Sequence, residues 1–169
     1  MKIDIIDDFL SDYHNRAIEN ALVGKFSNFP WLFDNNLNGK KRLGNYYFTY
    51  AMIDEGVIGC EKWLPIFIPL LDKLKIPLSN VFRLKTNLYP WTHRRVHHCT
   101  HRDYPPEAPL TTALYYVNTN NGITKFDGTF KSIKSKRNRI ALFNGSNYHH
   151  STSPTDSNYR TSVNIDYKL

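Results

Sequence analysis

The sequence has few cysteines, no long hydrophobic run and no basic, apolar leader at its start. Cys60 and Cys99 are its two cysteines, too few for the disulfide framework of a small secreted protein. No apolar run approaches the ~18 residues of a transmembrane helix, so we expect no membrane span. Residues 1–8 carry three acids where a signal peptide would be basic and then apolar. These absences predict a cytoplasmic protein.

The composition predicts a folded domain. Hydrophobic residues make up 41% of the chain and aromatic residues 14%, which favours a packed globule over disorder. A chain of 169 residues is most simply a single domain, residues 1–169. A domain of this size buries about 70% of the surface that its unfolded chain exposes. The net charge of +7 permits attraction to nucleic acid or acidic surfaces, but excess charge more often reflects solubility.

Hydrophobic periodicity and turn residues predict two helices and several strands. One helix begins after the N-cap Ser11 and ends at Gly24, and a second spans residues 60–74 with a kink at Pro69. Residues 25–45 are expected to form an irregular loop. Strands are expected over residues 2–6, 46–52, 80–89, 139–143 and 160–167, with another inside residues 101–118. The pattern favours a mainly antiparallel β domain with flanking helices, closed as a barrel or jelly roll.

Two of these strands each present one polar face, because alternate side chains of a strand point to the same side. The aromatic ring of Tyr89, at the end of the first polar face, is suited to line a site. The polar faces consist of Arg83, Lys85, Asn87 and Tyr89 on the first strand and of Arg160, Ser162, Asn164 and Asp166 on the second.

A histidine and a carboxylate stand two residues apart in His101-Arg102-Asp103. In an extended strand both side chains would point to one side and could bind one metal ion together. A second histidine near the end of the chain, His149 or His150, would complete the set. Two histidines and one carboxylate leave other coordination positions open, which is typical of non-haem Fe(II) oxygenases.

Two other interpretations of these histidines stay open. His101 and Asp103 alone would form a hydrogen-bonded pair in a loop. A structural zinc site is the second alternative, but its candidate ligands lack a CxxC spacing and crowd into one short loop. These candidates are His93, His97, His98 and Cys99.

Arg160 lies ten residues after His150, on a strand whose same face carries Ser162. An arginine that points into a barrel beside a metal needs an anion, because a buried unpaired guanidinium is costly. A dicarboxylate that binds the metal at one end and Arg160 at the other would satisfy both groups. The alternative is a structural ion pair with one of three carboxylates: Asp103, Asp156 or Asp166.

These residues resemble a known family, the Fe(II)/2-oxoglutarate-dependent dioxygenases, in particular their prolyl 4-hydroxylase-like branch. The resemblance begins weakly at residues 7–11 and is specific from residue 87 to residue 164. Its motifs are, in order, the H-x-D at residues 101–103, Leu-Tyr-Tyr-Val-Asn at 114–118, Gly-Ile-Thr-Lys-Phe at 122–126, His-Ser-Thr-Ser-Pro at 150–154 and Arg-Thr-Ser at 160–162. It implies a double-stranded β-helix core, the jelly roll of cupin-like proteins.

The resemblance also implies roles for individual residues. His101, Asp103 and His150 would bind Fe(II), with His150 preferred to His149 because its ten-residue distance from Arg160 matches the family better. Arg160 would hold the distal carboxylate of 2-oxoglutarate. O2 would be the oxidant, succinate and CO2 the co-products, and ascorbate an optional reductant. Further cosubstrate-binding residues would be Tyr89, Tyr116, Ser162 and Asn164.

The resemblance favours hydroxylation of an aliphatic C–H bond, in a prolyl residue of a peptide or protein or in free proline. Oxidative dealkylation or base oxidation of nucleic acid is the main alternative, since the basic loop at residues 131–139 could track phosphates. Against it, the nucleic-acid branch usually has a second arginine where this chain has Asp166. A non-catalytic metal-binding module is a third alternative.

Overall fold

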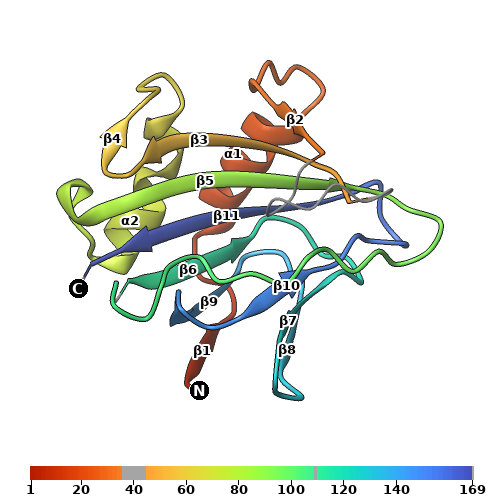
Figure 1. Ribbon diagram of the computed structural model, residues 1–169. Helices are drawn as coiled ribbons and strands as arrows, with labels where there is room; N and C mark the ends of the chain where they lie inside the picture. Colours follow the sequence, from red (N-terminus) through yellow and green to blue (C-terminus); the bar gives the residue numbers. More distant parts are fainter. Residues whose placement is uncertain (36–44, 109, 169) are drawn as a thin grey trace.

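The computed structural model describes residues 1–35, 45–108 and 110–168. In chain order the elements are β1 (Ile3–Ile6), α1 (Asp12–Val23), β2 (Leu32–Asp34), β3 (Tyr47–Asp54), β4 (Val57–Ile58), the 3-10 helix η2 (Leu64–Phe67), α2 (Ile68–Leu74), the 3-10 helix η3 (Leu78–Asn80), β5 (Val81–Pro90), β6 (Thr111–Tyr116), β7 (Ile123–Phe126), β8 (Ser132–Lys134), β9 (Arg139–Asn144), β10 (His149–Ser151) and β11 (Tyr159–Tyr167) (Figure 1). Within these ranges no helix has both the length and the apolar character needed to cross a membrane.

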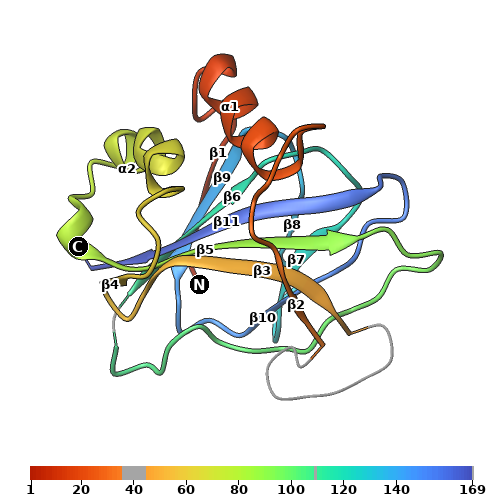
Figure 2. The same ribbon diagram turned by 90° about the horizontal axis from the view of Figure 1, so that it is seen from above.

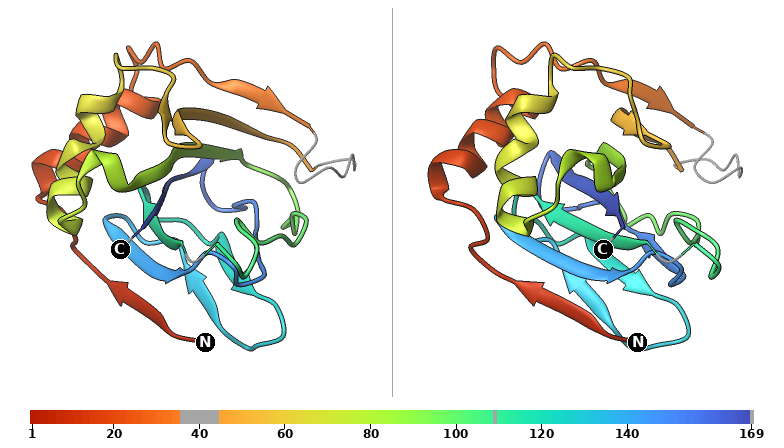
Figure 3. Two further views of the ribbon diagram at one scale, coloured as in Figure 1. Left: turned by 60° about the vertical axis from the view of Figure 1, so that its left-hand side comes forward. Right: turned by 90° about the vertical axis from the view of Figure 1, so that its left-hand side faces the viewer.

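The strands form two sheets. The larger has eight strands, in the order β1-β9-β6-β11-β5-β3-β2 with β4 paired to β3, and the smaller has the order β10-β7-β8. Every strand pairing in both sheets is antiparallel. Both α-helices cover one face of the large sheet, while the small sheet lies on the other side (Figures 2 and 3). The result is a mainly β fold with flanking helices, as the sequence predicted.

Side-chain alternation divides the apolar residues of the large sheet between two clusters. On β6, Tyr115 belongs to the cluster that includes Ile18 of α1 and Leu70 of α2. The next residue, Tyr116, belongs to the cluster between the sheets, together with Phe126 of β7. Thus one face of β6 holds the helices and the other holds the small sheet.

The same alternation on β11 creates the polar face that the sequence predicted. Val163, Ile165 and Tyr167 lie in the helix-side cluster. The intervening side chains therefore face the small sheet. β11 pairs with β5 so that Arg160 lies opposite Tyr89 and Asp166 lies opposite Arg83. The two polar faces thus become one surface inside the fold.

The first helix has the boundaries that its capping residues predict. Ser11 accepts a hydrogen bond from the backbone N–H of His14, and the helix ends before Gly24. A side chain at Gly24 would bring its Cβ within 2.5 Å of the Asn20 carbonyl oxygen, so glycine allows the chain to turn there. Ile18 and Leu22 are buried against the sheet, as predicted.

Two sequence-based boundaries were wrong. The predicted helix over residues 60–74 is two shorter pieces, η2 and α2. Pro69 does not kink a longer helix but stands in the first turn of α2, where its missing N–H breaks no intrahelical bond. The predicted loop over residues 25–45 contains β2, which pairs with β3. Residues 36–44 of that loop lie outside the described part of the chain.

Candidate metal and cosubstrate site

His101 and Asp103 lie between β5 and β6, outside the named strands, and the strand expected inside residues 101–118 is β6. An isolated antiparallel bridge fixes this segment to the start of β10. Its two hydrogen bonds join the backbone N–H and C=O groups of His101 and His149, at 3.0 Å and 2.8 Å. The backbone N–H of Asp103 donates to the Gly145 carbonyl at 2.9 Å. Segments far apart in the sequence are thereby held side by side.

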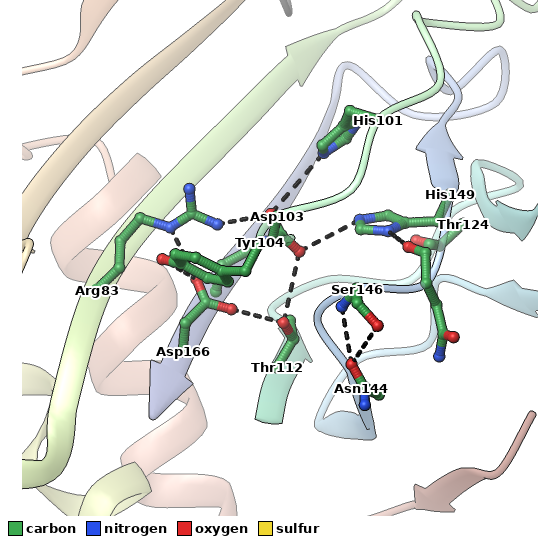
Figure 4. Close-up of polar contacts among 12 residues, drawn as sticks. Arg83, His101, Asp103, Tyr104, Thr112, Thr124, Asn144, Ser146, His149 and Asp166 are labelled. Atoms are coloured by element: carbon green, nitrogen blue, oxygen red, sulfur yellow. Dashed lines mark hydrogen bonds and ion pairs between the residues drawn. The ribbon is translucent and has the colours of Figure 1, made fainter. Parts of the chain in front are cut away.

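Three side chains converge at this bridge: His101, Asp103 and His149 (Figure 4). His101 Nε2 lies 3.9 Å from Asp103 Oδ1, and His149 Nε2 lies 3.6 Å from Asp103 Oδ2. One ligand atom from each residue lies within 4.8 Å of the others. Two imidazole nitrogens and one carboxylate oxygen at these distances fit the facial set that binds Fe(II) in non-haem oxygenases.

Hydrogen bonds to backbone carbonyls orient both imidazoles. His101 Nδ1 lies 3.3 Å from the Cys99 carbonyl oxygen, and His149 Nδ1 lies 2.9 Å from that of Asn147. A carbonyl oxygen accepts only, so each Nδ1 donates, and the Nε2 atom of each ring faces Asp103. Burial, with a contribution from His149, lowers the pKa of His101 to about 4, so His101 is neutral at pH 7.

His150, the predicted third ligand, is placed elsewhere. Its Nδ1 lies 3.0 Å from Asp127 Oδ1, and its Nε2 lies 3.2 Å from His97 Nδ1. Consecutive residues of a strand point to opposite sides, so β10 presents either His149 or His150 to Asp103. The structure therefore places His149, and not the expected His150, beside Asp103, packed against Phe126 and Phe143 of the inter-sheet cluster.

Asp103 is also bound to a network that the sequence analysis did not predict (Figure 4). Arg83 Nη2 donates to Asp103 Oδ1 at 2.6 Å, and Arg83 Nε donates to Asp166 Oδ2 at 2.7 Å. Thr112 Oγ1 donates to Asp166 Oδ1 at 2.6 Å and lies 3.4 Å from Asp103 Oδ2. Burial would raise the pKa of Asp103, but Arg83 and the two histidines outweigh it and lower that pKa. Burial raises the pKa of Asp166 to about 6.

A cavity of about 210 Å³ opens beside the three converging side chains. The polar-face residues of β5 line it, and so do the two central ones of β11, so the predicted cosubstrate residues Tyr89, Ser162 and Asn164 all lie on its wall. Leu114 is the one aliphatic side chain among the described residues of this lining. The cationic and carboxylate residues on it are Arg83, Lys85, Arg102 and Asp103.

Arg160 and Tyr116 do not line this cavity but lie directly behind it. Arg160 is fully buried, and its Cζ lies 5.3 Å from the ring centre of Tyr89 and 5.7 Å from that of Tyr116. It donates to the hydroxyls of Ser135 and Thr124, both at 2.8 Å, and to the Thr152 carbonyl at 3.1 Å. Gly122 leaves room for it, because a Cβ there would lie 2.7 Å from Arg160 Cδ.

The charge of Arg160 has no ion-pair partner among the described residues. Two of the three carboxylates considered as structural partners, Asp103 and Asp166, bind Arg83 instead. The third, Asp156, accepts a hydrogen bond from the backbone N–H of Asn121. The structural ion-pair alternative for Arg160 is therefore wrong, and a buried guanidinium is surrounded by hydroxyls, a carbonyl and aromatic rings.

The alternative zinc ligands also separate in the structure. His98 is buried against Tyr89, whereas His97 contacts His150. In the described ranges the only cluster of three or more residues with metal-binding geometry is His101, Asp103 and His149. Sequence reasoning missed Arg83 and Thr112 as partners of Asp103, and the paired polar faces of β5 and β11 were the signal that could have indicated Arg83.

Comparisons with known proteins support the fold. No protein-family model and no curated protein matches the chain. A prolyl hydroxylase from Trichoplax adhaerens, solved with a peptide fragment of the hypoxia inducible factor oxygen degradation domain, matches 98% of this chain and 82% of its own, with 15% identity and a TM-score of 0.67.

Two further structures match with similar quality. The viral collagen prolyl hydroxylase of Paramecium Bursaria Chlorella virus-1, in a 2OG complex, has 17% identity, a TM-score of 0.62 and coverage of 98% of this chain and 95% of its own. The non-heme alpha ketoglutarate dependent epimerase SnoN from nogalamycin biosynthesis has 11% identity, a TM-score of 0.64 and coverage of 98% and 77%. The predicted jelly-roll core is thus confirmed, and the chain has the prolyl-hydroxylase-like fold of 2-oxoglutarate-dependent oxygenases.

Proposed function

We propose that this protein is an Fe(II)- and 2-oxoglutarate-dependent oxygenase. The observation that carries the proposal is the convergence of His101, Asp103 and His149, with the Nε2 atoms of both imidazoles facing one carboxylate. The similar structures include an epimerase as well as prolyl hydroxylases, so the fold alone does not determine the reaction.

The donor set fits Fe(II), which His101, Asp103 and His149 would hold. Bound Fe(II) would supply oxidative chemistry driven by O2 and by the conversion of 2-oxoglutarate to succinate and CO2. The protein would position the reactants and exclude water from the cavity. The backbone bridge between His101 and His149 would keep the metal-binding groups in register while substrate enters.

Arg160 would hold the distal carboxylate of 2-oxoglutarate. No carboxylate in the described part of the chain pairs with its buried charge, and an anion would supply the missing partner. Tyr89 both lines the cavity and contacts Arg160, so a carboxylate that enters beside Tyr89 approaches the guanidinium. Tyr116, Ser162 and Asn164 would complete the cosubstrate pocket.

For the substrate we propose a prolyl residue in a peptide or protein, or free proline, hydroxylated at an aliphatic C–H bond. The fold likeness to prolyl hydroxylases, one of them solved with a peptide, supports this class. Nucleic acid stays the alternative, and it is disfavoured because Asp166 occupies the position of the expected second arginine and binds Arg83.

Anaerobic addition of Fe(II) and 2-oxoglutarate tests the site. We expect the weak visible charge-transfer band of the chelate to appear in the wild-type protein and to be lost in His101→Ala and His149→Ala. His150→Ala is the matched control, since it removes an adjacent histidine that faces Asp127, and it should retain the band.

Two results would contradict this proposal. If folded, metal-loaded wild-type protein gives no band, the oxygenase function is wrong. If His150→Ala loses the band and His149→Ala keeps it, the ligand assignment returns to His150. Incubation with O2 and a proline-containing peptide then tests the substrate, through a mass gain of one oxygen in the peptide.

A further inference from the structure

We propose that Arg83 is a positioning residue for the metal centre: it orients the carboxylate of Asp103, and Asp166 in turn holds Arg83. This inference rests on the proposed function, because it assigns Asp103 to the metal. It adds a layer of the site that the sequence motifs do not contain.

The geometry of Arg83 is that of a fork between two carboxylates (Figure 4). Its Nη2 contacts Asp103 Oδ1 at 2.6 Å and its Nε contacts Asp166 Oδ2 at 2.7 Å. The side chains of Asp103 and Asp166 are 4% and 0% exposed, and that of Arg83 is 20% exposed. Charge-assisted bonds this short between nearly buried groups fix the orientation of all three side chains.

Asp103 depends on such support because no regular strand holds it. It lies in the segment between β5 and β6, attached through its N–H to Gly145. Arg83 and Asp166, in contrast, are directly opposite each other on the paired strands β5 and β11. The rigid pair of strands therefore orients a carboxylate that comes from an irregular segment.

Because Arg83 binds one carboxylate oxygen of Asp103, the other oxygen is better placed to bind a metal. Arg83 binds Oδ1 of Asp103, while Oδ2 lies 3.6 Å from His149 Nε2 and makes only a long contact with Thr112. Mutation of a residue that hydrogen-bonds to a metal ligand commonly weakens metal binding by about 10- to 100-fold. Two effects oppose each other here, because the positive charge of Arg83 disfavours a cation whereas its hydrogen bond fixes the ligand. We infer that orientation dominates.

Titration of the metal-free protein with Co(II), followed by the visible absorption of the bound ion, separates these effects. Arg83→Met should weaken Co(II) binding about 10-fold or more and change the shape of the absorption band. Arg83→Lys, which keeps the charge but loses the fork, should lie between Arg83→Met and the wild type. Asp166→Asn should change the band in the same direction by a smaller amount, because it loosens Arg83 without removing it.

Arg139→Met is the matched control. Arg139 also forms a two-bond ion pair, with Asp7, and its side chain is 19% exposed, but this pair lies at β9, away from Asp103. It should leave Co(II) affinity and spectrum unchanged. Wild-type affinity and spectrum in Arg83→Met, or tighter binding, would overturn the positioning role.

Failure of one variant to fold does not remove the test. If Arg83→Met does not fold, unchanged spectra in both Arg83→Lys and Asp166→Asn would overturn the inference. If wild-type protein itself binds no Co(II), or binds it equally well after His101→Ala, the proposed metal site is wrong. In contrast, if wild-type protein binds Co(II) and this binding is unchanged in the Arg83 variants, only the positioning role of Arg83 is wrong.

Discussion

Two arginines on the same pair of strands have opposite electrostatic environments. Arg83 on β5 lies between two carboxylates, each within 2.7 Å of a guanidinium nitrogen. Arg160 on β11 is more deeply buried, yet its bonds go to two hydroxyls and a carbonyl, and no carboxylate of the described residues pairs with it. Both point to the cavity side of the large sheet, so the difference comes from their neighbours.

This difference favours a role in organising other side chains for Arg83 and a role in ligand binding for Arg160. The protein neutralises Arg83 itself, so Arg83 can serve to organise other side chains. No described carboxylate neutralises Arg160, although a buried unpaired charge costs free energy. Such a cost is explained if an anion from solution binds there during function. We therefore propose that Arg160 binds the cosubstrate carboxylate and that Arg83 orients the metal ligand Asp103.

The largest expected effect is on the stability of the metal-free protein. Arg83→Met leaves two buried carboxylates without their cation and should lower the free energy of unfolding by about 3–5 kcal/mol. Arg160→Met removes a charge that lacks an ionic partner, so its cost should be clearly smaller. Urea unfolding of both variants, followed by tryptophan fluorescence, measures the difference. Equal losses of unfolding free energy in the two variants would contradict the proposed difference between the two arginines.

The second prediction concerns 2-oxoglutarate. At saturating Co(II), Arg160→Met should weaken 2-oxoglutarate binding about 100-fold, or about 2.8 kcal/mol, because it removes the cation that would pair with the distal carboxylate. Arg160→Lys should retain part of the affinity, since it keeps the charge but not the bidentate geometry. Calorimetric titration gives both constants. Succinate, which shares the distal carboxylate, should lose affinity in parallel.

Unchanged 2-oxoglutarate affinity in Arg160→Met would show that another cation holds the distal carboxylate. Lys85 is then the first residue to test, because it lines the cavity and donates to the Tyr47 hydroxyl at 3.0 Å.

The smallest expected effect is the contribution of His98 to the pH dependence of stability. Burial, and then the charge of Arg160, lowers the pKa of His98 to about 3. Because the pKa of an unfolded histidine is about 6.5, the unfolded chain gains a proton between these values that the folded chain does not. Stability should therefore fall as pH drops from about 6.5 towards 3, by about 2 kcal/mol at pH 5 from this residue.

His98→Phe tests this prediction. The loss of stability between pH 7.5 and pH 5 should be smaller in His98→Phe than in the wild type, as measured by urea unfolding of metal-free protein. His93→Phe, at an exposed position, is the control and should keep the wild-type pH dependence. An identical pH dependence in all three proteins would mean that His98 takes up its proton in the folded state.

Local sequence patterns predicted much of the fold. The capping residues of α1, the strand at residues 80–89 and the strand at residues 160–167 were all correct within one or two residues. The polar faces of the last two strands were also correct, and most of their residues line the cavity. Errors occurred where pairing between distant segments decides the structure, as in β2, and where one proline fits either a kink or a first turn.

The sequence by itself determined which residue types gather at the site. It placed His101 beside Asp103, a histidine pair before Arg160, and alternating polar residues on two strands. Strand alternation has a period of two residues and is a local property, so these faces are readable without a structure.

The tertiary structure decided between His149 and His150 and between a paired and an unpaired arginine. Adjacent histidines point to opposite sides of β10, and the register of β10 against β7, together with its bridge to His101, determines which side faces Asp103. In the same way, the β5–β11 register gives Arg83 its carboxylate and leaves Arg160 opposite Tyr89. Register is set by the pairing of strands distant in sequence, and a one-residue shift would exchange every inward and outward side chain.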